Sequence, residues 1–171
     1  NSKTTVKGNL KAEGGKLGGN GGRIETSGFS IDINEAKVST NSKNGKAGEW
    51  LIDPYNITIS SSGGSDYTAN EDDEVINVSL LETSLNSSNI TVFTGNSGSQ
   101  DGNITVSSSI SSGSSNNLTL RSANDISINA NITRSGSGGL ILEPGSNTVN
   151  GSGSISLTAG SNISTSSGAN V

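Results

Sequence analysis

Few residue types in this sequence can carry out chemistry. The chain contains no His and no Cys, which excludes Ser–His and Cys–His nucleophiles and the zinc centres built on these residues. Acidic residues cluster only in SDYTANEDDEV, Ser65 to Val75. This stretch lacks the central Gly and final Glu of an EF-hand loop, so we expect a solvated acidic loop, with weak calcium binding by Asp66, Asp72 and Asp73 as the alternative. No other pair of carboxylates suggests a glycosidase, and we predict no catalytic residue, no cofactor and no enzyme activity.

Nine Asn-x-Ser/Thr sequons are candidate glycosylation sites. With 22 Asn and 49 Ser plus Thr in 171 residues, about six sequons are expected by chance. Strands in which outward Asn and Thr flank an inward aliphatic residue create further ones. Glycosylation is therefore a hypothesis and not a conclusion. The nine sequons begin at Asn56, Asn77, Asn86, Asn89, Asn103, Asn117, Asn131, Asn150 and Asn162.

The stretch GEWLIDPYNITIS, Gly48 to Ser60, concentrates bulk in an otherwise small and polar chain, and it holds the only Trp. We expect Trp50 to be structural, because a single aromatic residue with few aromatic neighbours makes a poor platform for sugar stacking, which is the alternative. Asp53 precedes Pro54, and a residue before proline is restricted to extended geometry, so this pair should set the next strand. The carboxylate of Asp53 can also accept backbone N–H groups in a turn.

The elements that must position these residues are short strands in which aliphatic residues alternate with Ser, Thr or Asn. Gly-, Ser- and Asn-rich joints separate them. The acidic segment Asn70 to Leu85 is the one place where a short helix is an alternative. Strands are predicted at Phe29–Ile33, Asn56–Ser60, Asn77–Leu80, Asn89–Phe93, Asn103–Ser107, Asn117–Leu120, Asp125–Asn129 and Ser154–Thr158.

The spacing of these strands favours a repeat. Ile104 and Ile126 are 22 residues apart in the sequence, and so are Leu118 and Leu140. This recurrence at about 22 residues, with two or three strands per period, is typical of a parallel β-helix, in which outward Asn, Ser and Thr can stack in ladders. We predict an all-β fold over a single domain, residues 1–171, as a right-handed parallel β-helix of roughly eight coils, with a β-sandwich as the alternative.

Composition limits the partners. Ser, Gly, Asn and Thr make up more than half of the chain, yet Leu, Ile, Val and Phe are numerous and regularly spaced enough to build a core. The net charge is −5 and the isoelectric point is near 4.6, so nucleic acid is not an expected partner. No apolar run of about 18 residues occurs, so we expect no membrane insertion.

The stretch GGRIETSGFSIDINEAKVSTNSKNGKAGEWLIDPYNITIS, Gly21 to Ser60, resembles a block found in two-partner-secretion exoproteins. These are the filamentous-haemagglutinin-like and high-molecular-weight adhesins of Gram-negative bacteria. The resemblance covers about a quarter of the chain, and beyond Ser60 it lies only in the Asn-, Ser-, Thr- and Gly-rich style of the repeats. The matching positions are Gly21, Gly22, Glu25, Thr26, Ser27, Gly28, Gly48, Trp50, Leu51, Asp53 and Pro54.

The resemblance implies a parallel β-helix, secretion to the bacterial cell surface, and attachment to host cells. It implies structural roles for Glu25, Thr26, Ser27 and Gly28, and likewise for Trp50, Leu51, Asp53 and Pro54. No Asn-Pro pair of the family's secretion domain is present. We therefore expect a fragment from downstream of that domain, through which the parent chain would meet its outer-membrane transporter. Some of these adhesins carry hexoses on sequon asparagines.

These observations lead to three functional hypotheses. The first is a non-enzymatic adhesin segment, acting as a shaft, as a surface that binds a host-cell glycan or matrix protein, or as both. The second is the stalk of a contact-dependent toxin or cytolysin whose activity lies elsewhere in the parent chain. The third is a β-helical enzyme acting on polysaccharide, against which the missing catalytic residues argue.

Overall fold

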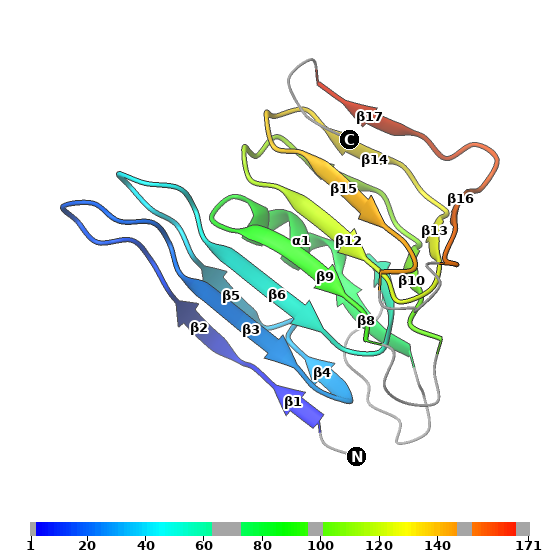
Figure 1. Ribbon diagram of the computed structural model, residues 1–171, viewed down its shortest axis with the longest axis horizontal. Coiled ribbons are helices and arrows are strands. Elements are labelled where there is room, and N and C mark those ends of the chain that lie inside the picture. The colour runs from blue at the N-terminus through cyan, green and yellow to red at the C-terminus, as the bar shows by residue number, and fades with distance from the viewer. Residues whose placement is uncertain (1–2, 63–72, 96–100, 147–151, 167–171) are drawn as a thin grey trace.

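The computed structural model describes residues 3–62, 73–95, 101–146 and 152–166. Within this part of the chain, every pairing between named strands is parallel, and the strands form five sheets (Figure 1). The prediction of an all-β, parallel structure is confirmed, with one short helix added. The described strands do not show the antiparallel pairing that a β-sandwich is built on.

Strands from successive parts of the chain lie side by side in each sheet. One five-stranded sheet contains β3 (Arg23–Ser27), β6 (Glu49–Asp53), β9 (Asn89–Phe93), β12 (Leu118–Arg121) and β15 (Leu140–Glu143). The other contains, in spatial order, β8 (Asp73–Asn77), β7 (Asn56–Ser60), β10 (Ile104–Val106), β13 (Ile126–Ile128) and β16 (Ile155–Leu157). The smaller sheets are β11 (Ile110–Ser112), β14 (Ile132–Arg134) and β17 (Ile163–Thr165); β1 (Lys3–Thr5) with β4 (Ser30–Asp32); and β2 (Gly8–Lys11) with β5 (Ala36–Ser39).

The predicted spacing of about 22 residues is the pairing register between β10–β12 and β13–β15. Ile104 pairs with Ile126 in β10 and β13, and Leu118 pairs with Leu140 in β12 and β15. Elsewhere the spacing is longer, since Ile104 also pairs with Ile57. The described strands therefore follow one another at uneven spacing, and β7 and β8 lie next to each other in one sheet, so the even period on which the prediction of roughly eight coils rests is not kept.

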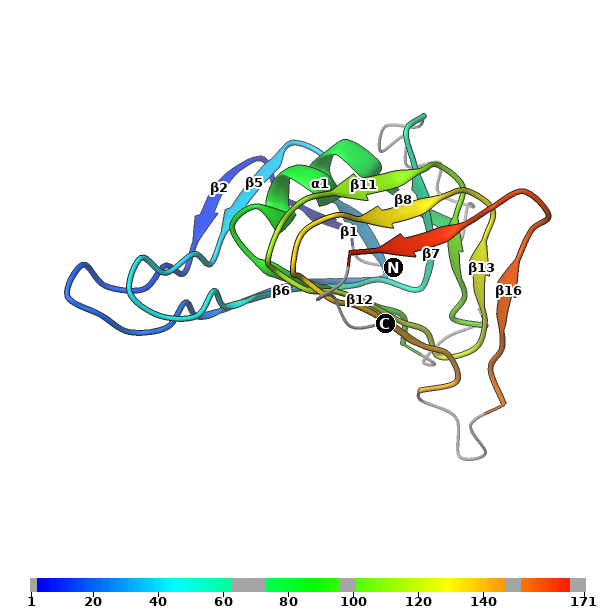
Figure 2. The same ribbon diagram turned by 90° about the horizontal axis from the view of Figure 1, so that it is seen from above.

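Alternation along the strands builds the core. In β10 the side chains of Ile104 and Val106 are fully buried while Thr105 between them is partly exposed, and β13 repeats this pattern. Seen from above, the sheets lie on three sides of a common interior, which the buried aliphatic side chains fill (Figure 2). Because successive side chains of a strand point to opposite faces, the polar residues of each strand are left on the outer surface.

The helix α1 (Val78–Leu85) corrects one predicted strand. We expected a strand at Asn77–Leu80, but Asn77 ends β8 and caps the helix, its side chain accepting the N–H of Ser79 at 2.8 Å. Leu81 and Leu85, one helical turn apart, then face the core together, as helical periodicity requires. The helix contacts both β5 and β11, so it takes the place of a strand between these two short sheets.

Candidate binding surface

Two loops project together from the strands and form what we call the arm, residues 12–22 and 40–48. They extend away from the sheets at the left of Figures 1 and 2. Hydrogen bonds join one loop to the other, which makes the arm a continuation of the strand stacking outside the core. These bonds run from Gly14 N to Asn41 O (2.8 Å), Gly21 N to Lys46 O (2.9 Å) and Asn44 Nδ2 to Lys16 O (3.1 Å), while a bond from Gly48 N to Thr40 O (2.8 Å) closes the base of the second loop.

Glycines allow the two loops to approach this closely. A Cβ atom at Gly48 would lie 1.9 Å from the carbonyl oxygen of Gly22, and one at Gly21 would lie 1.7 Å from that of Thr40. These distances are far below van der Waals contact, so any side chain would push the loops apart. Gly21, Gly22 and Gly48 are among the positions of the sequence resemblance, and here they hold the base of the arm.

Positive charge gathers at this end of an acidic chain. Every lysine of the sequence lies between Lys3 and Lys46. Positions 1–48 hold eight basic and four acidic side chains, a net charge of +4, and the rest of the chain holds two basic and eleven acidic ones, a net charge of −9. An uneven distribution of charge of this kind affects partner binding and solubility more than it affects folding.

The lysines at this end differ in whether they have a carboxylate partner. Lys3, Lys7 and Lys11 form ion pairs with Asp32, Glu35 and Glu13 respectively. By contrast, Lys16, Lys43 and Lys46 are exposed on the arm and have no carboxylate partner among the described residues.

The tip of the arm is a tight turn in which the N–H of Gly18 bonds to the carbonyl of Gly15 at 3.2 Å. It presents Lys16 and Leu17, and the side chain of Leu17 is completely exposed. The arm therefore offers three cations that lack a described carboxylate partner, and one apolar side chain, to solvent.

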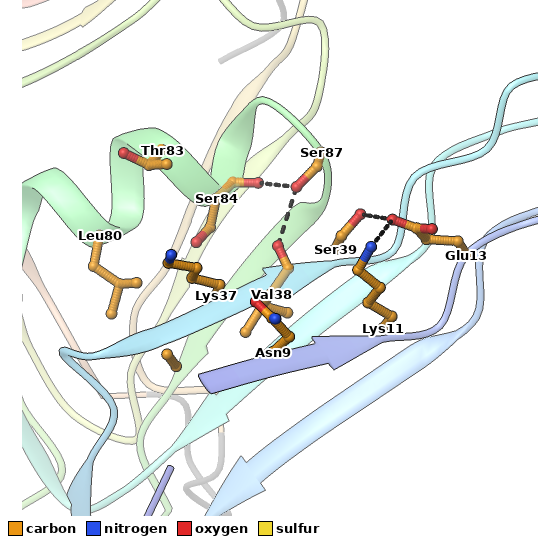
Figure 3. A pocket seen from close by; sticks show the side chains of 11 residues that line it. Asn9, Lys11, Glu13, Lys37, Val38, Ser39, Leu80, Thr83, Ser84 and Ser87 are labelled. Carbon is orange, nitrogen blue, oxygen red and sulfur yellow. Dashed lines mark hydrogen bonds and ion pairs between the residues drawn. The ribbon is translucent and has the colours of Figure 1, made fainter. Parts of the chain in front are cut away.

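A groove of about 240 Å³ lies beside the base of the arm, between α1 and the sheet of β2 and β5 (Figure 3). Val38 and Leu80 give it an apolar floor, and Lys37 stands at its edge. Ser87 links the two walls, since its hydroxyl donates to the carbonyl of Val38 at 3.1 Å.

A second, polar recess of about 390 Å³ also borders the arm. Its lining consists of small and amide residues together with one lysine, namely Gly45, Lys46, Ala47, Asn89, Ser115, Asn116 and Asn117. The amide of Asn89 is already engaged, because its Nδ2 donates to the carbonyls of Ala47 and Gly48, both at 3.0 Å. Lys46 thus lies on the arm and in the recess, which makes these two features one continuous surface.

Most residues of the sequence resemblance lie in or next to β3 and β6, which are neighbouring strands of the sheet that also contains β9, β12 and β15. Trp50 is fully buried in β6, and its indole N–H donates to the hydroxyl of Thr26 in β3 at 3.1 Å. Its ring is therefore covered by protein and offers no face to a sugar. Gly28 lies against Thr4, where an added Cβ would come within 2.8 Å of the hydroxyl.

The remaining motif residues lie nearer the surface. The carboxylate of Glu25 pairs with Arg23 at 3.2 Å, and Ser27 contributes its carbonyl as an acceptor for Thr4. Leu51 and Asp53 are half-buried in β6, and Pro54 after them is buried.

The electrostatics of Asp53 differ from what we expected. Among the described residues no backbone N–H bonds to its carboxylate; instead, burial and, secondarily, the negative charge of Glu25 raise its pKa above the ordinary value.

Most of the sequon asparagines form ladders. Asn89, Asn103 and Asn117 stand at or just before a strand, and each side-chain oxygen accepts the backbone N–H at the matching position of the next strand. The ladder bonds are Asn56 to Asn103 N (2.8 Å), Asn89 to Asn117 N (2.9 Å), Asn103 to Asp125 N (3.0 Å), Asn117 to Gly139 N (2.8 Å) and Asn131 to Asn162 N (2.9 Å). Sequence reasoning expected outward ladders of Asn, Ser and Thr but did not connect them with these asparagines, although their recurrence before an aliphatic residue was a signal.

Three other sequons differ from the ladders. Asn77 caps α1, as described above. The side chains of Asn86 and Asn162 are exposed and have no hydrogen bond within the described part of the chain. Asn150 lies outside the described residues.

Two of the three residues proposed for the calcium alternative, Asp66 and Asp72, lie outside the described part of the chain, and Asp73 is placed only as the first residue of β8. No group of three or more acidic, His or Cys side chains gathers within the described ranges. Nor does any helix there have the length and apolarity needed to cross a membrane.

Arg134 is an unusual member of the interior. Its side chain is fully buried at the end of β14, with Nη2 donating to the carbonyl of Asn116. Burial lowers the pKa of its guanidinium, and neither Nε nor Nη1 has a hydrogen-bond partner within the described structure. This arginine belongs to β14 and not to the arm, and the one described hydrogen bond of its side chain is to Asn116, which lines the polar recess.

Comparison with known proteins adds no assignment: no model of a protein family matches this chain, and no curated protein matches it significantly.

Proposed function

We propose that this chain is a right-handed parallel β-helical segment of a secreted, non-enzymatic bacterial surface adhesin of the two-partner-secretion group. Its outer-membrane transporter would act through a secretion domain elsewhere in the parent protein. At the cell surface the segment serves as a shaft and presents the arm, with the two hollows beside it, to a host-cell glycan or matrix protein.

The observation that carries this proposal is the continuous parallel stacking of strands with an arm built on it. Successive sets of strands pair in register with one another, which is the local geometry of a β-helix. Parallel strands joined by crossovers are right-handed in nearly all proteins, which supports the hand that we propose. A stack of this kind tolerates outward loops, because each loop leaves the buried rows unchanged.

The purified segment, labelled with a fluorophore, tests the proposal by its binding to cultured epithelial cells. We expect saturable binding that excess unlabelled segment displaces. A control is the same segment unfolded in urea and diluted immediately before use. Absence of saturable binding by the folded segment would refute a role in attachment and would favour a stalk for a toxin or cytolysin.

Glycosylation belongs to this proposal in a narrower form. The ladder asparagines have their side-chain oxygens committed to neighbouring strands, whereas the side chains of Asn86 and Asn162 make no hydrogen bond to any described residue. If sugar is added to the folded chain, these two positions are the expected acceptors among the described sequons. Peptide mass spectrometry of native material locates them, and hexose found chiefly on Asn89 or Asn117 would contradict the restriction.

A further inference from the structure

We propose that the arm binds a linear polyanionic polysaccharide, a glycan chain that carries sulfate or carboxylate groups on successive sugars. This inference rests on the proposed function and deepens it by naming the class of ligand. Its basis is that the arm lysines have no described carboxylate partner, that the two loops are layered, and that hydrogen bonds hold the loops together.

The lysines of the arm supply the charge for such a ligand. Lys16, Lys43 and Lys46 are exposed and unpaired with any described carboxylate, while the lysines of β1 and β2 and the segment between them are neutralised by acidic neighbours. A cation without an intramolecular partner gains more from an arriving anion, because no existing ion pair has to be broken. Positive charge is therefore available on the arm, although the whole chain is acidic.

The layering of the loops places these charges in a series. Lys16 belongs to the first loop, and its carbonyl accepts from Asn44, which lies between Lys43 and Lys46 in the sequence of the second loop. Lys46 is tied to the first loop as well, since its N–H donates to the side chain of Asn20 at 3.0 Å. Neighbouring layers of a parallel stack are about 4.8 Å apart. A chain with repeated anions can engage lysines of both layers, and the linked contacts reinforce one another.

The rigidity of the arm reduces the cost of binding. Backbone hydrogen bonds join the two loops at Gly14 and at Gly21, and Gly21 and Gly48 pack so closely against carbonyls of the opposite loop that no side chain fits there. The lysine backbones are thus ordered before the ligand arrives, so that mainly side-chain freedom is lost on binding.

Leu17 raises the alternative of an anionic lipid surface, on which lysines and an apolar side chain act together. We favour the polysaccharide because the three lysines occupy both layers, whereas Leu17 is a single apolar residue. One exposed apolar side chain is common on protein surfaces and does not indicate a membrane.

The test measures binding of the segment to immobilised dextran sulfate, with neutral dextran as the reference, by surface plasmon resonance over a range of salt concentrations. The arm variant is K16S/K43S/K46S. The matched control is K3S/K7S/K11S, which removes the same charge from the paired lysines. We expect the arm variant to lose about tenfold or more in affinity and the slope of log affinity against log salt to fall by about two to three. The control variant should lose less than about threefold.

Several results would overturn the inference. Equal losses in the two triple variants would show a general charge effect and no site on the arm. Equal binding of neutral dextran would exclude recognition of the anionic groups. Stronger binding to vesicles of anionic phospholipid, abolished by Leu17→Ser, would assign the arm to lipid. Saturable cell binding that the arm variant retains would refute this inference and leave the proposed function standing.

Discussion

Replacement of Trp50 by Ala tests how the core of the first strands is held together. Trp50 is fully buried in β6, between Ile24 of β3 and Ile90 of β9. A buried Trp removes about 150–250 Å² from water, which at about 25 cal/mol per Å² corresponds to about 4–6 kcal/mol. The usual cost of Trp→Ala in a protein core is about 3–5 kcal/mol, which overlaps this range. We expect a loss of this size in the free energy of unfolding.

Urea unfolding followed by circular dichroism measures the loss, because the variant no longer contains a fluorescent Trp. Thr26→Val removes the acceptor of the indole N–H at 3.1 Å, together with the donation of the Thr26 hydroxyl to the carbonyl of Leu51 at 3.4 Å, and leaves the buried indole N–H unpaired, at a cost of about 1–3 kcal/mol. The matched control is Leu17→Ala, where the side chain is fully exposed and the change should stay within about 0.5 kcal/mol.

The wild-type chain supplies an independent check, since Trp50 is its only Trp. Its emission should be blue-shifted in the native protein, shielded from iodide quenching, and shifted to longer wavelength by urea. A cost below about 1 kcal/mol for Trp50→Ala, which is far under the usual range for a buried Trp, would refute the placement of this residue in the core. Emission of a solvated Trp in the native state would refute it as well.

Three further substitutions test the arm, the ladders and the acidic motif. Gly48→Ala should cost about 1–3 kcal/mol in urea unfolding, because its Cβ would meet the carbonyl of Gly22, and an unchanged midpoint would contradict the close contact. Asn117→Ala should cost about 1 kcal/mol by the same measurement, whereas Asn86→Ala should be nearly neutral; equal effects would mean that the ladder adds nothing. Because burial raises the pKa of Asp53, the folded state binds its proton more tightly than the unfolded state. Wild-type stability should therefore gain a contribution as pH falls through the raised pKa toward 3.8, and Asp53→Asn should remove it; identical pH profiles of Tm in the two proteins would contradict the raised pKa.

Local alternation was sufficient to predict several strands, but Glu49–Asp53 and Leu140–Glu143 were missed although each holds two or more aliphatic residues, because these residues are adjacent and do not only alternate with polar ones. Asn56–Ser60 and Asn89–Phe93 are strands with the bounds expected from the sequence. Ile110–Ser112 and Ile163–Thr165 were missed, since so short a strand with one aliphatic residue has the composition of the joints around it. Asn77–Leu80 was wrong because a brief alternating pattern also fits the first turn of a capped helix.

What the sequence by itself determined is the side-chain alternation, the parallel class of fold and the regular spacing that brings Ile104 beside Ile126. These follow from short-range rules, because a strand exposes its faces alternately and stacking repeats the same rows. Only the tertiary structure decided that α1 replaces a strand, that Asn89 and Asn117 form a ladder, and that Lys16 and Lys46 meet on one arm. These outcomes depend on which segments, distant from one another in the sequence, become neighbours, and the degenerate Gly- and Ser-rich joints do not encode that choice locally.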